Sequence, residues 1–259
     1  KLMKRLLFFF FLLALFITIP MAVSANDIII ELDSLNDEAT IANYQKSINI
    51  CEKALKTDPD SFELNWRCAR AYRWYGELAK RAGMKDWEDI CAKYGKMGMD
   101  YAQKASELEP SLPHGYYWYG VNVGIYSDGV SIVRAISEGL KGKTQKNFEK
   151  VYEADKNFEN AGAILSLGRF WAVLPWPLND KKLSLKYYRE YQKTEHFGIA
   201  VVEGPIFLSE LLIDMGSAAN KTEAKQLLGN VKTDNKYFKD RIQKLLAKLD
   251  KQADEPTSR

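Results

Sequence analysis

Residues 109–124, EPSLPHGYYWYGVNVG, decide the fold. Pro110 and Pro113 end one helix and begin the next, because proline has no N–H for a helix interior. Large residues then surround Gly120 in the spacing Tyr-x-x-Tyr-Gly-x-x-Val over residues 116–123. A small residue at this point of a helix lets a neighbouring helix pack closely. The stretch therefore predicts the first helix of a helical hairpin, with Gly120 facing the second helix.

Two further segments have related spacing. Residues 68–72 follow the break at Pro59, and residues 164–171 are Ile-x-x-Leu-Gly-x-x-Trp. All three segments resemble the first helix of a tetratricopeptide (TPR) repeat, large-x-x-Leu-Gly-x-x-Tyr. We therefore predict an all-α fold, a TPR-like α-solenoid of about four to five helical hairpins with a C-terminal capping helix. The alternative is an irregular helical bundle with chance matches.

The predicted repeat core covers residues 38–251. Pro59 and Pro110 are 51 residues apart, more than the roughly 34 of a standard TPR repeat, so we expect an insertion near 81–94 that lengthens one hairpin. The expected hairpins are 38–57 (half a repeat or a cap), 62–108, 113–158, 161–195 and 203–231, followed by a helix at 234–251.

The N-terminal segment has the pattern of a secretory signal. Lys1, Lys4 and Arg5 precede an apolar run over 6–19, and small residues at 23–25 suit cleavage after Ala25. We expect residues 1–25 to be a signal peptide and 26–259 a single TPR-like domain that is periplasmic or secreted. No cysteine precedes Cys51, so no lipidation cysteine follows the apolar run. An uncleaved N-terminal anchor is the alternative.

Charge and motifs disfavour several function classes. The chain carries 37 Lys and Arg and 34 Asp and Glu; without the three cations of the first 25 residues, 34 oppose 34. A nucleic-acid binder needs a net basic surface, so we expect no nucleic-acid partner. The sequence contains no HExxH, GxSxG or GxGxxG motif and no zinc-type cysteine spacing. We therefore expect no enzyme activity, no cofactor and no metal site.

A binding groove follows from the repeat positions. If Ala69, Gly120 and Gly168 mark equivalent positions, the inner face of each first helix can be assigned. Arginine suits carboxylates and aromatic rings provide apolar walls, so we predict a groove for an organic acid or an acidic peptide, with Arg70 and Arg169 facing one cavity. The alternative is that these arginines only pair with acids between helices. The predicted groove residues are Glu63, Trp66, Arg67, Arg70, Arg73, Trp74, His114, Tyr117, Trp118 and Arg169.

Two further expectations concern single positions. Cys51 and Cys68 lie at equal distances from the turn near Pro59, so we expect them side by side, either as a disulfide or as two small buried residues. Trp176 lies between Pro175 and Pro177. We expect it to fill the core, with an exposed interface anchor as the alternative.

Four segments together resemble a particular family: residues 62–72, 94–105, 112–124 and 167–178. They resemble the T component of tripartite ATP-independent periplasmic (TRAP) transporters over about residues 40–230, and eukaryotic microtubule-associated repeat proteins contain similar segments. The resemblance implies a degenerate TPR scaffold that associates with the transporter's substrate-binding P component and helps pass an organic-acid or hydrophobic ligand through a pore. Members of that family are often lipoproteins. This chain differs from them because no lipidation cysteine follows its apolar N-terminal run.

The function hypotheses that remain are of three classes. The first is a non-enzymatic scaffold for protein–protein interaction. A second copy of this chain, forming a homo-oligomer, is one of the partners considered. The second is a stand-alone protein that binds a small molecule or lipid. The third is a hydrolase or lyase on a helical solenoid, for which the sequence shows no nucleophile–base pair. The shape of the groove and the residues in it distinguish the three.

Overall fold

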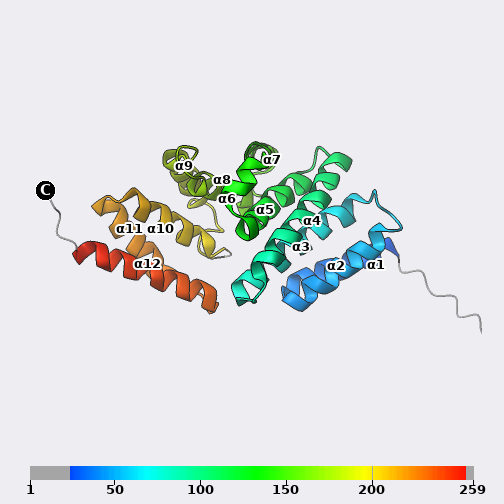
Figure 1. Cartoon of the computed structure of the whole chain (residues 1–259), viewed down its shortest axis with the longest axis horizontal. Helices are drawn as coiled ribbons and strands as arrows, with labels where there is room; N and C mark the ends of the chain where they lie inside the picture. Colours follow the sequence, from blue (N-terminus) through cyan, green and yellow to red (C-terminus); the bar gives the residue numbers. More distant parts are fainter. Residues whose placement is uncertain (1–23, 200, 255–259) are drawn as a thin grey trace, which may run out of the picture.

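The computed structural model describes residues 24–199 and 201–254, and this part of the chain is helical without a β-strand (Figure 1). The signal peptide predicted for residues 1–25 lies outside the described residues, except for Ser24 and Ala25. The twelve described helices are α1 Ala25–Glu38, α2 Ile41–Leu55, α3 Phe62–Ala82, α4 Trp87–Leu108, α5 Pro113–Val130, α6 Ile132–Ser137, α7 Leu140–Ala154, α8 Phe158–Val173, α9 Lys181–Tyr191, α10 Glu203–Met215, α11 Ala218–Asn230 and α12 Lys236–Asp254.

These helices form the predicted series of hairpins. The pairs are α1/α2, α3/α4, α5/α7, α8/α9 and α10/α11, and α12 packs against α10 and α11 at the C-terminal end. The all-α solenoid is therefore confirmed. α3 and α4, with 21 and 22 residues, make the lengthened hairpin that the distance between prolines predicted.

The first hairpin begins earlier than expected. Residues 28–30 are three isoleucines, which favour a strand, but they lie inside α1. Ser24 starts this helix with a capping box: its hydroxyl accepts from the N–H of Asp27, and the Asp27 carboxylate accepts from the N–H of Ser24. Leu32 and Leu35 then bury one face of α1. The N-terminal end is thus a full hairpin rather than half a repeat.

The glycines of the repeat pattern have the predicted role. A Cβ atom on Gly120 would lie 2.5 Å from the ring of Phe148 on α7, and one on Gly168 would lie 2.6 Å from the ring of Tyr188 on α9. Both distances are too short for any side chain, so each glycine admits the second helix of its own hairpin. The same device joins α4 to α5, where a Cβ on Gly95 would lie 2.5 Å from the backbone nitrogen of Tyr126.

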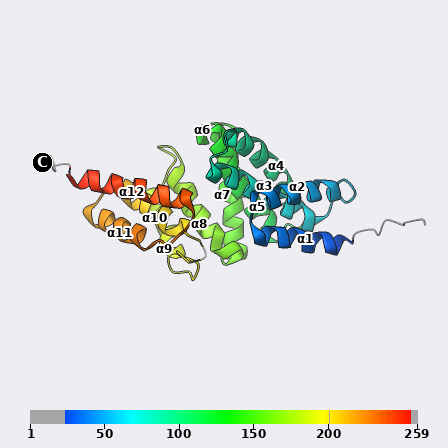
Figure 2. The same cartoon turned by 90° about the horizontal axis from the view of Figure 1, so that it is seen from below.

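The row of hairpins curves so that its two halves meet again. In Figure 1 the first turn of α12 lies beside the last turn of α3. Nη2 of Arg81 on α3 lies 2.6 Å from the carboxylate of Glu203 on α10, and its guanidinium lies 4.6 Å from the ring centroid of Phe238 on α12. Figure 2 shows α7 and α8 between the two halves. No described helix is both long and apolar enough to cross a lipid bilayer.

Candidate functional site

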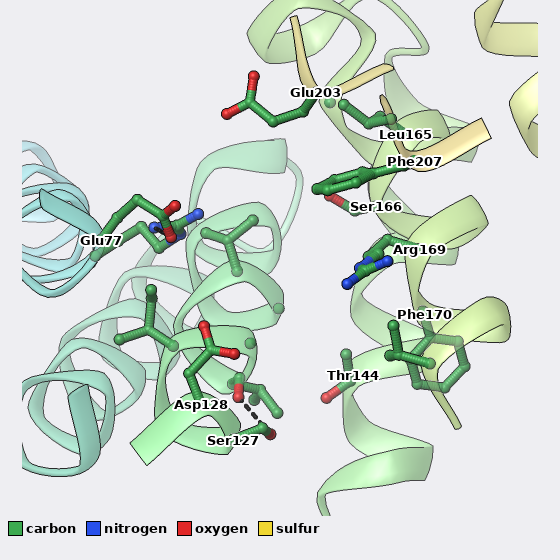
Figure 3. Close-up of a pocket in the computed structure, with 18 of the residues that line it drawn as sticks. Glu77, Ser127, Asp128, Thr144, Leu165, Ser166, Arg169, Phe170, Glu203 and Phe207 are labelled. Atoms are coloured by element: carbon green, nitrogen blue, oxygen red, sulfur yellow. Dashed lines mark hydrogen bonds and ion pairs between the residues drawn. The ribbon is translucent and has the colours of Figure 1, made fainter. Parts of the chain in front are cut away.

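A cavity of about 640 Å³ lies inside the curve, between α3 and α5 on one side and α8, α10 and α12 on the other. Figure 3 shows Glu77 and Asp128 on one wall and Ser166, Arg169 and Phe207 on the opposite wall. The volume is in the range of small-molecule sites. Its apolar lining includes Trp74, Tyr117, Trp118, Val121, Ile125, Leu140, Phe148, Leu165, Phe170, Tyr191, Phe207 and Phe238.

One wall holds a buried ion-pair cluster, which we call the Glu77 cluster: Glu77 with Arg73, Lys80 and Arg81 of α3. The Glu77 carboxylate is 3.0 Å from Nη1 of Arg73, 2.7 Å from Nε of Arg81 and 3.5 Å from Nζ of Lys80. Burial alone would raise the pKa of Glu77, but the three cations lower it. Lys80 and Arg81 also reach carboxylates on α5 and α10. The cluster therefore ties α3 to α5 beside it and to α10 across the cavity.

The opposite wall presents two arginines to a single acid. Arg241 donates to both oxygens of Glu210, from Nε at 2.7 Å and Nη2 at 2.9 Å, and Arg169 donates to Glu210 from Nη1 at 2.7 Å. Both guanidiniums lie against the ring of Phe207. Within the described residues, only Nη1 of the Arg169 guanidinium makes a hydrogen bond, and Figure 3 shows this side chain pointing into the cavity. Arg169 can therefore bind a further anion.

Two residues of the cavity lining each carry a fully buried donor without a partner. The indole Nε1–H of Trp118 and the hydroxyl of Tyr191 make no hydrogen bond to any described residue, and both residues are almost fully buried. A buried polar group without a partner costs about 1–3 kcal/mol. Both atoms are shut off from the cavity surface, so a ligand in the cavity does not reach them without a movement of the wall.

The start of α8 has an unusual backbone at the cavity wall. Glu159, Asn160 and Ala161 have φ of 50°, 57° and 58°, in the left-handed region that non-glycine residues rarely adopt. Glu159 lines the cavity and has no ion-pair partner among the described residues. Its side chain is open to the cavity but has protein on most sides, and burial raises its pKa. Such strain is commonly found at functional sites.

Gly124 forms part of the cavity floor. It lies on α5 between the buried residues Val123 and Ile125, yet it is itself exposed. A Cβ atom there would meet no atom within 4 Å. Glycine in a helix interior costs roughly 0.5–1 kcal/mol relative to alanine. No packing contact accounts for this glycine, and its main effect is to leave the backbone open to the cavity.

Five predicted groove residues line this cavity, and five do not. The cavity is lined by Arg73, Trp74, Tyr117, Trp118 and Arg169. Its lining does not include Glu63, Trp66, Arg67, Arg70 or His114.

The second five form a separate cluster around Asp33 of α1. Asp33 accepts from Nη2 of Arg67 at 2.7 Å and from Nη2 of Arg70 at 2.7 Å, while Glu63 accepts from Arg67 and from the indole of Trp66. His114 packs against the Trp66 ring, with 4.9 Å between centroids, and burial lowers its pKa. The prediction that Arg70 and Arg169 share one cavity is therefore wrong, because Asp33 holds Arg70 in this separate cluster.

The cysteine pair is placed as expected. Cys51 and Cys68 are fully buried neighbours on α2 and α3, and both are free thiols in the structure. Burial and the adjacent Cys51 raise the pKa of Cys68. The structure therefore places the pair together as small buried residues, and a disulfide between them stays a prediction.

Trp176 is not a core residue. It is 85% exposed in the loop between α8 and α9, so the expected core position is wrong. The buried Leu174, which precedes Pro175, lines the cavity instead.

The sequence patterns did not reveal several cavity residues from the C-terminal half, namely Glu203, Phe207, Phe238 and Arg241. They reach the cavity only because the solenoid curves back on itself. The described residues contain no group of three or more His, Cys, Asp or Glu positioned to hold a metal ion.

The fold and cavity define a TPR-like helical repeat scaffold. The crystal structure of a thermophilic TPR protein from Thermus thermophilus is similar, with a TM-score of 0.60 and 14% identity over 85% of this chain and 99% of that one. At this identity the likeness shows the fold alone. Residues 28–171 match the family model "Regulator of microtubule dynamics protein 1-3". The chain belongs to this family, whereas the T-component family was expected. No curated protein matches the chain.

Proposed function

We propose that this protein is a non-enzymatic binding scaffold whose central cavity takes an anionic, partly apolar group. That group is an organic acid or an acidic segment of a partner protein. The observation that carries the proposal is the combination of an apolar cavity with donors that lack partners. These donors are the N–H groups of Arg169 that make no hydrogen bond to a described residue.

Three of the four carboxylates that line the cavity are arranged for binding rather than catalysis, and Glu159 is the one without an ion pair to a described residue. The carboxylates Glu77, Asp128 and Glu203 are all held in ion pairs with Lys80 or Arg81. Such pairs stabilise the walls and leave these acids poorly placed to transfer protons. The remaining donor groups can orient a ligand.

Titration with 1-anilinonaphthalene-8-sulfonate, an anionic aromatic probe, tests the proposal. Arg169→Gln should weaken binding of the probe by about 1.5–3 kcal/mol, roughly ten- to a hundredfold, because one charge-assisted contact is lost. Glu210 keeps both hydrogen bonds from Arg241, so the wall should stay intact. Arg134→Gln is the matched control, since Arg134 is exposed on α6 and outside the cavity. Equal affinity of all three proteins would contradict the proposal.

The partner is the second part of the proposal. The segments that resemble T components support a periplasmic substrate-binding P component of a TRAP transporter, which would place this chain in the periplasm. The family description supports a microtubule-associated partner instead. Affinity capture from native cells distinguishes them, with Arg169→Gln as the comparison. A substrate-binding protein retained by the wild type and lost by the variant supports the first partner, and tubulin supports the second. Recovery of neither contradicts both.

A further inference from the structure

The loop between α8 and α9 presents a tryptophan to solvent. Trp176 is 85% exposed, and the nearby Leu178 is also exposed. The loop is held in shape, because the N–H of Leu178 donates to the carbonyl of Pro175 at 2.8 Å and that of Asp180 to the carbonyl of Trp171 at 3.2 Å. The loop therefore holds the large aromatic side chain of Trp176 in solvent, where the rest of the protein does not bury its apolar surface.

A third exposed apolar residue lies on α6, the short helix that precedes α7. Val133 on α6 is 66% exposed. α6 leads into Lys141, whose ammonium lies 5.3 Å from the ring centroid of Trp171 at the end of α8. Residues of both segments, Ile136 and Leu174 among them, line the cavity. We call Val133, Trp176 and Leu178 together the Trp176 face.

Positive charge is concentrated in the segments that carry this face. Residues 131–146 contain four cations and one acid, and residues 171–186 contain three cations and one acid, a combined net charge of +5. The whole chain is only +3, so the remainder has a net charge of −2. Arg134 and Lys181 are paired with acids. In these two segments, five lysines have no ion pair to a described residue: Lys141, which also lines the cavity, and Lys143, Lys146, Lys182 and Lys186.

The chemistry of this face fits a lipid surface better than a protein surface. Lysine is depleted at protein–protein interfaces, and six of these seven cations are lysines. Three separate apolar side chains are also few for a protein interface of roughly 800 Å² on each side. Anionic bilayers, by contrast, attract each nearby lysine, and tryptophan favours the headgroup region. We propose that the Trp176 face docks on an anionic lipid surface, with Trp176, Leu178 and Val133 at headgroup level. This docking is independent of ligand binding in the cavity.

A local probe in the full chain tests the proposal. Leu178→Cys is labelled with an environment-sensitive nitrobenzoxadiazole dye, and Ile199→Cys, at a position that is 83% exposed outside this face, is the matched control. The native cysteines are buried and should not react. Vesicles in which one lipid in three is phosphatidylserine should increase the emission at 178 severalfold and leave 199 unchanged. Vesicles of phosphatidylcholine alone should have little effect.

A second variant measures the contribution of the tryptophan. Trp176→Ala should weaken vesicle binding about tenfold, since a large apolar side chain no longer inserts, whereas Ile199→Ala should not. Residues 1–23 are the same in every variant, so a difference in vesicle binding between two variants comes from the substituted position. Equal emission at 178 and 199, equal response to both vesicle types, or a response to polyglutamate with none to vesicles would overturn the proposal. The last result would indicate an acidic protein partner.

Discussion

Replacing Glu77 by glutamine keeps the shape of this side chain and removes its charge. Glu77 is only 7% exposed and accepts one hydrogen bond each from Arg73 and Arg81. A hydrogen bond to a charged group contributes about 1.5–3 kcal/mol and a neutral one about 0.5–1.5 kcal/mol. Glutamine keeps one acceptor oxygen, so one bond becomes neutral and loses about 1–1.5 kcal/mol, while the other has no acceptor and loses about 1.5–3 kcal/mol. Lys80 also loses one of its two acids. We therefore expect a total loss of about 3 kcal/mol, at the lower end of the range for breaking buried ion pairs.

Equilibrium unfolding in urea, followed by far-ultraviolet circular dichroism at neutral pH, measures this loss. Asp240→Asn is the matched control: Asp240 also pairs with a cation four residues away, Lys236, but at the protein surface, where such pairs contribute little. A loss below about 1 kcal/mol for Glu77→Gln, or equal losses for the two variants, would refute the reasoning about buried charge.

Acid should remove the difference between wild type and Glu77→Gln. The folded-state pKa of Glu77 is lowered from its ordinary value of 4.5, because the three cations outweigh burial. A lowered carboxyl pKa stabilises the fold above the unfolded pKa, and this contribution is lost as the pH falls through the folded pKa. The stabilities of the two proteins should therefore converge below pH 4.5. A constant difference across this range would contradict the pKa shift.

Three other substitutions or measurements test separate parts of the structure. Gly95→Ala should destabilise the protein by about 1–3 kcal/mol despite the better helix propensity of alanine, because its Cβ would lie 2.5 Å from the backbone nitrogen of Tyr126; unchanged urea unfolding would contradict the tight α4–α5 contact. Glu159→Gln should stabilise the protein at neutral pH and have no effect in acid, since a raised carboxyl pKa penalises the fold only once the group ionises; a gain that persists in acid would argue against this cause. Cys51 and Cys68 are buried, so they should react with a thiol reagent only as fast as the protein unfolds; rapid labelling of the native protein would contradict their burial.

The helices could be predicted from the sequence because their ends are marked locally. The prolines at 59, 110 and 113 and the small residues at 120 and 168 act within one or two turns, so the hairpins from 62 to 231 were placed closely. α1 was missed because its isoleucines are β-branched and its capping box was not recognised. This error affected the groove prediction as well. α1 supplies Asp33, which binds the arginines at 67 and 70.

The far wall of the cavity could not be predicted for a different reason. Glu203, Phe207 and Arg241 belong to α10 and α12, more than a hundred residues from Arg81. Their position depends on the curvature accumulated over all the hairpins, which no local pattern records. The exposed Trp176 was misjudged because its bulk and apolar neighbours favour burial. Its loop lies outside the hairpin packing, so the repeat pattern gives no information on it.

Binding of the anionic naphthalene probe to Gly124→Leu tests the central claim most directly. Gly124 is on the cavity floor with no atom within 4 Å of an added Cβ, so leucine should fill cavity space without displacing the fold. Gly229→Leu is the control, because Gly229 is also helical with open space around it but lies on α11 outside the cavity. We expect Gly124→Leu to remain folded and bind the probe more weakly, and Gly229→Leu to bind it like the wild type. A folded Gly124→Leu that binds the probe with wild-type affinity would contradict the cavity as the binding site.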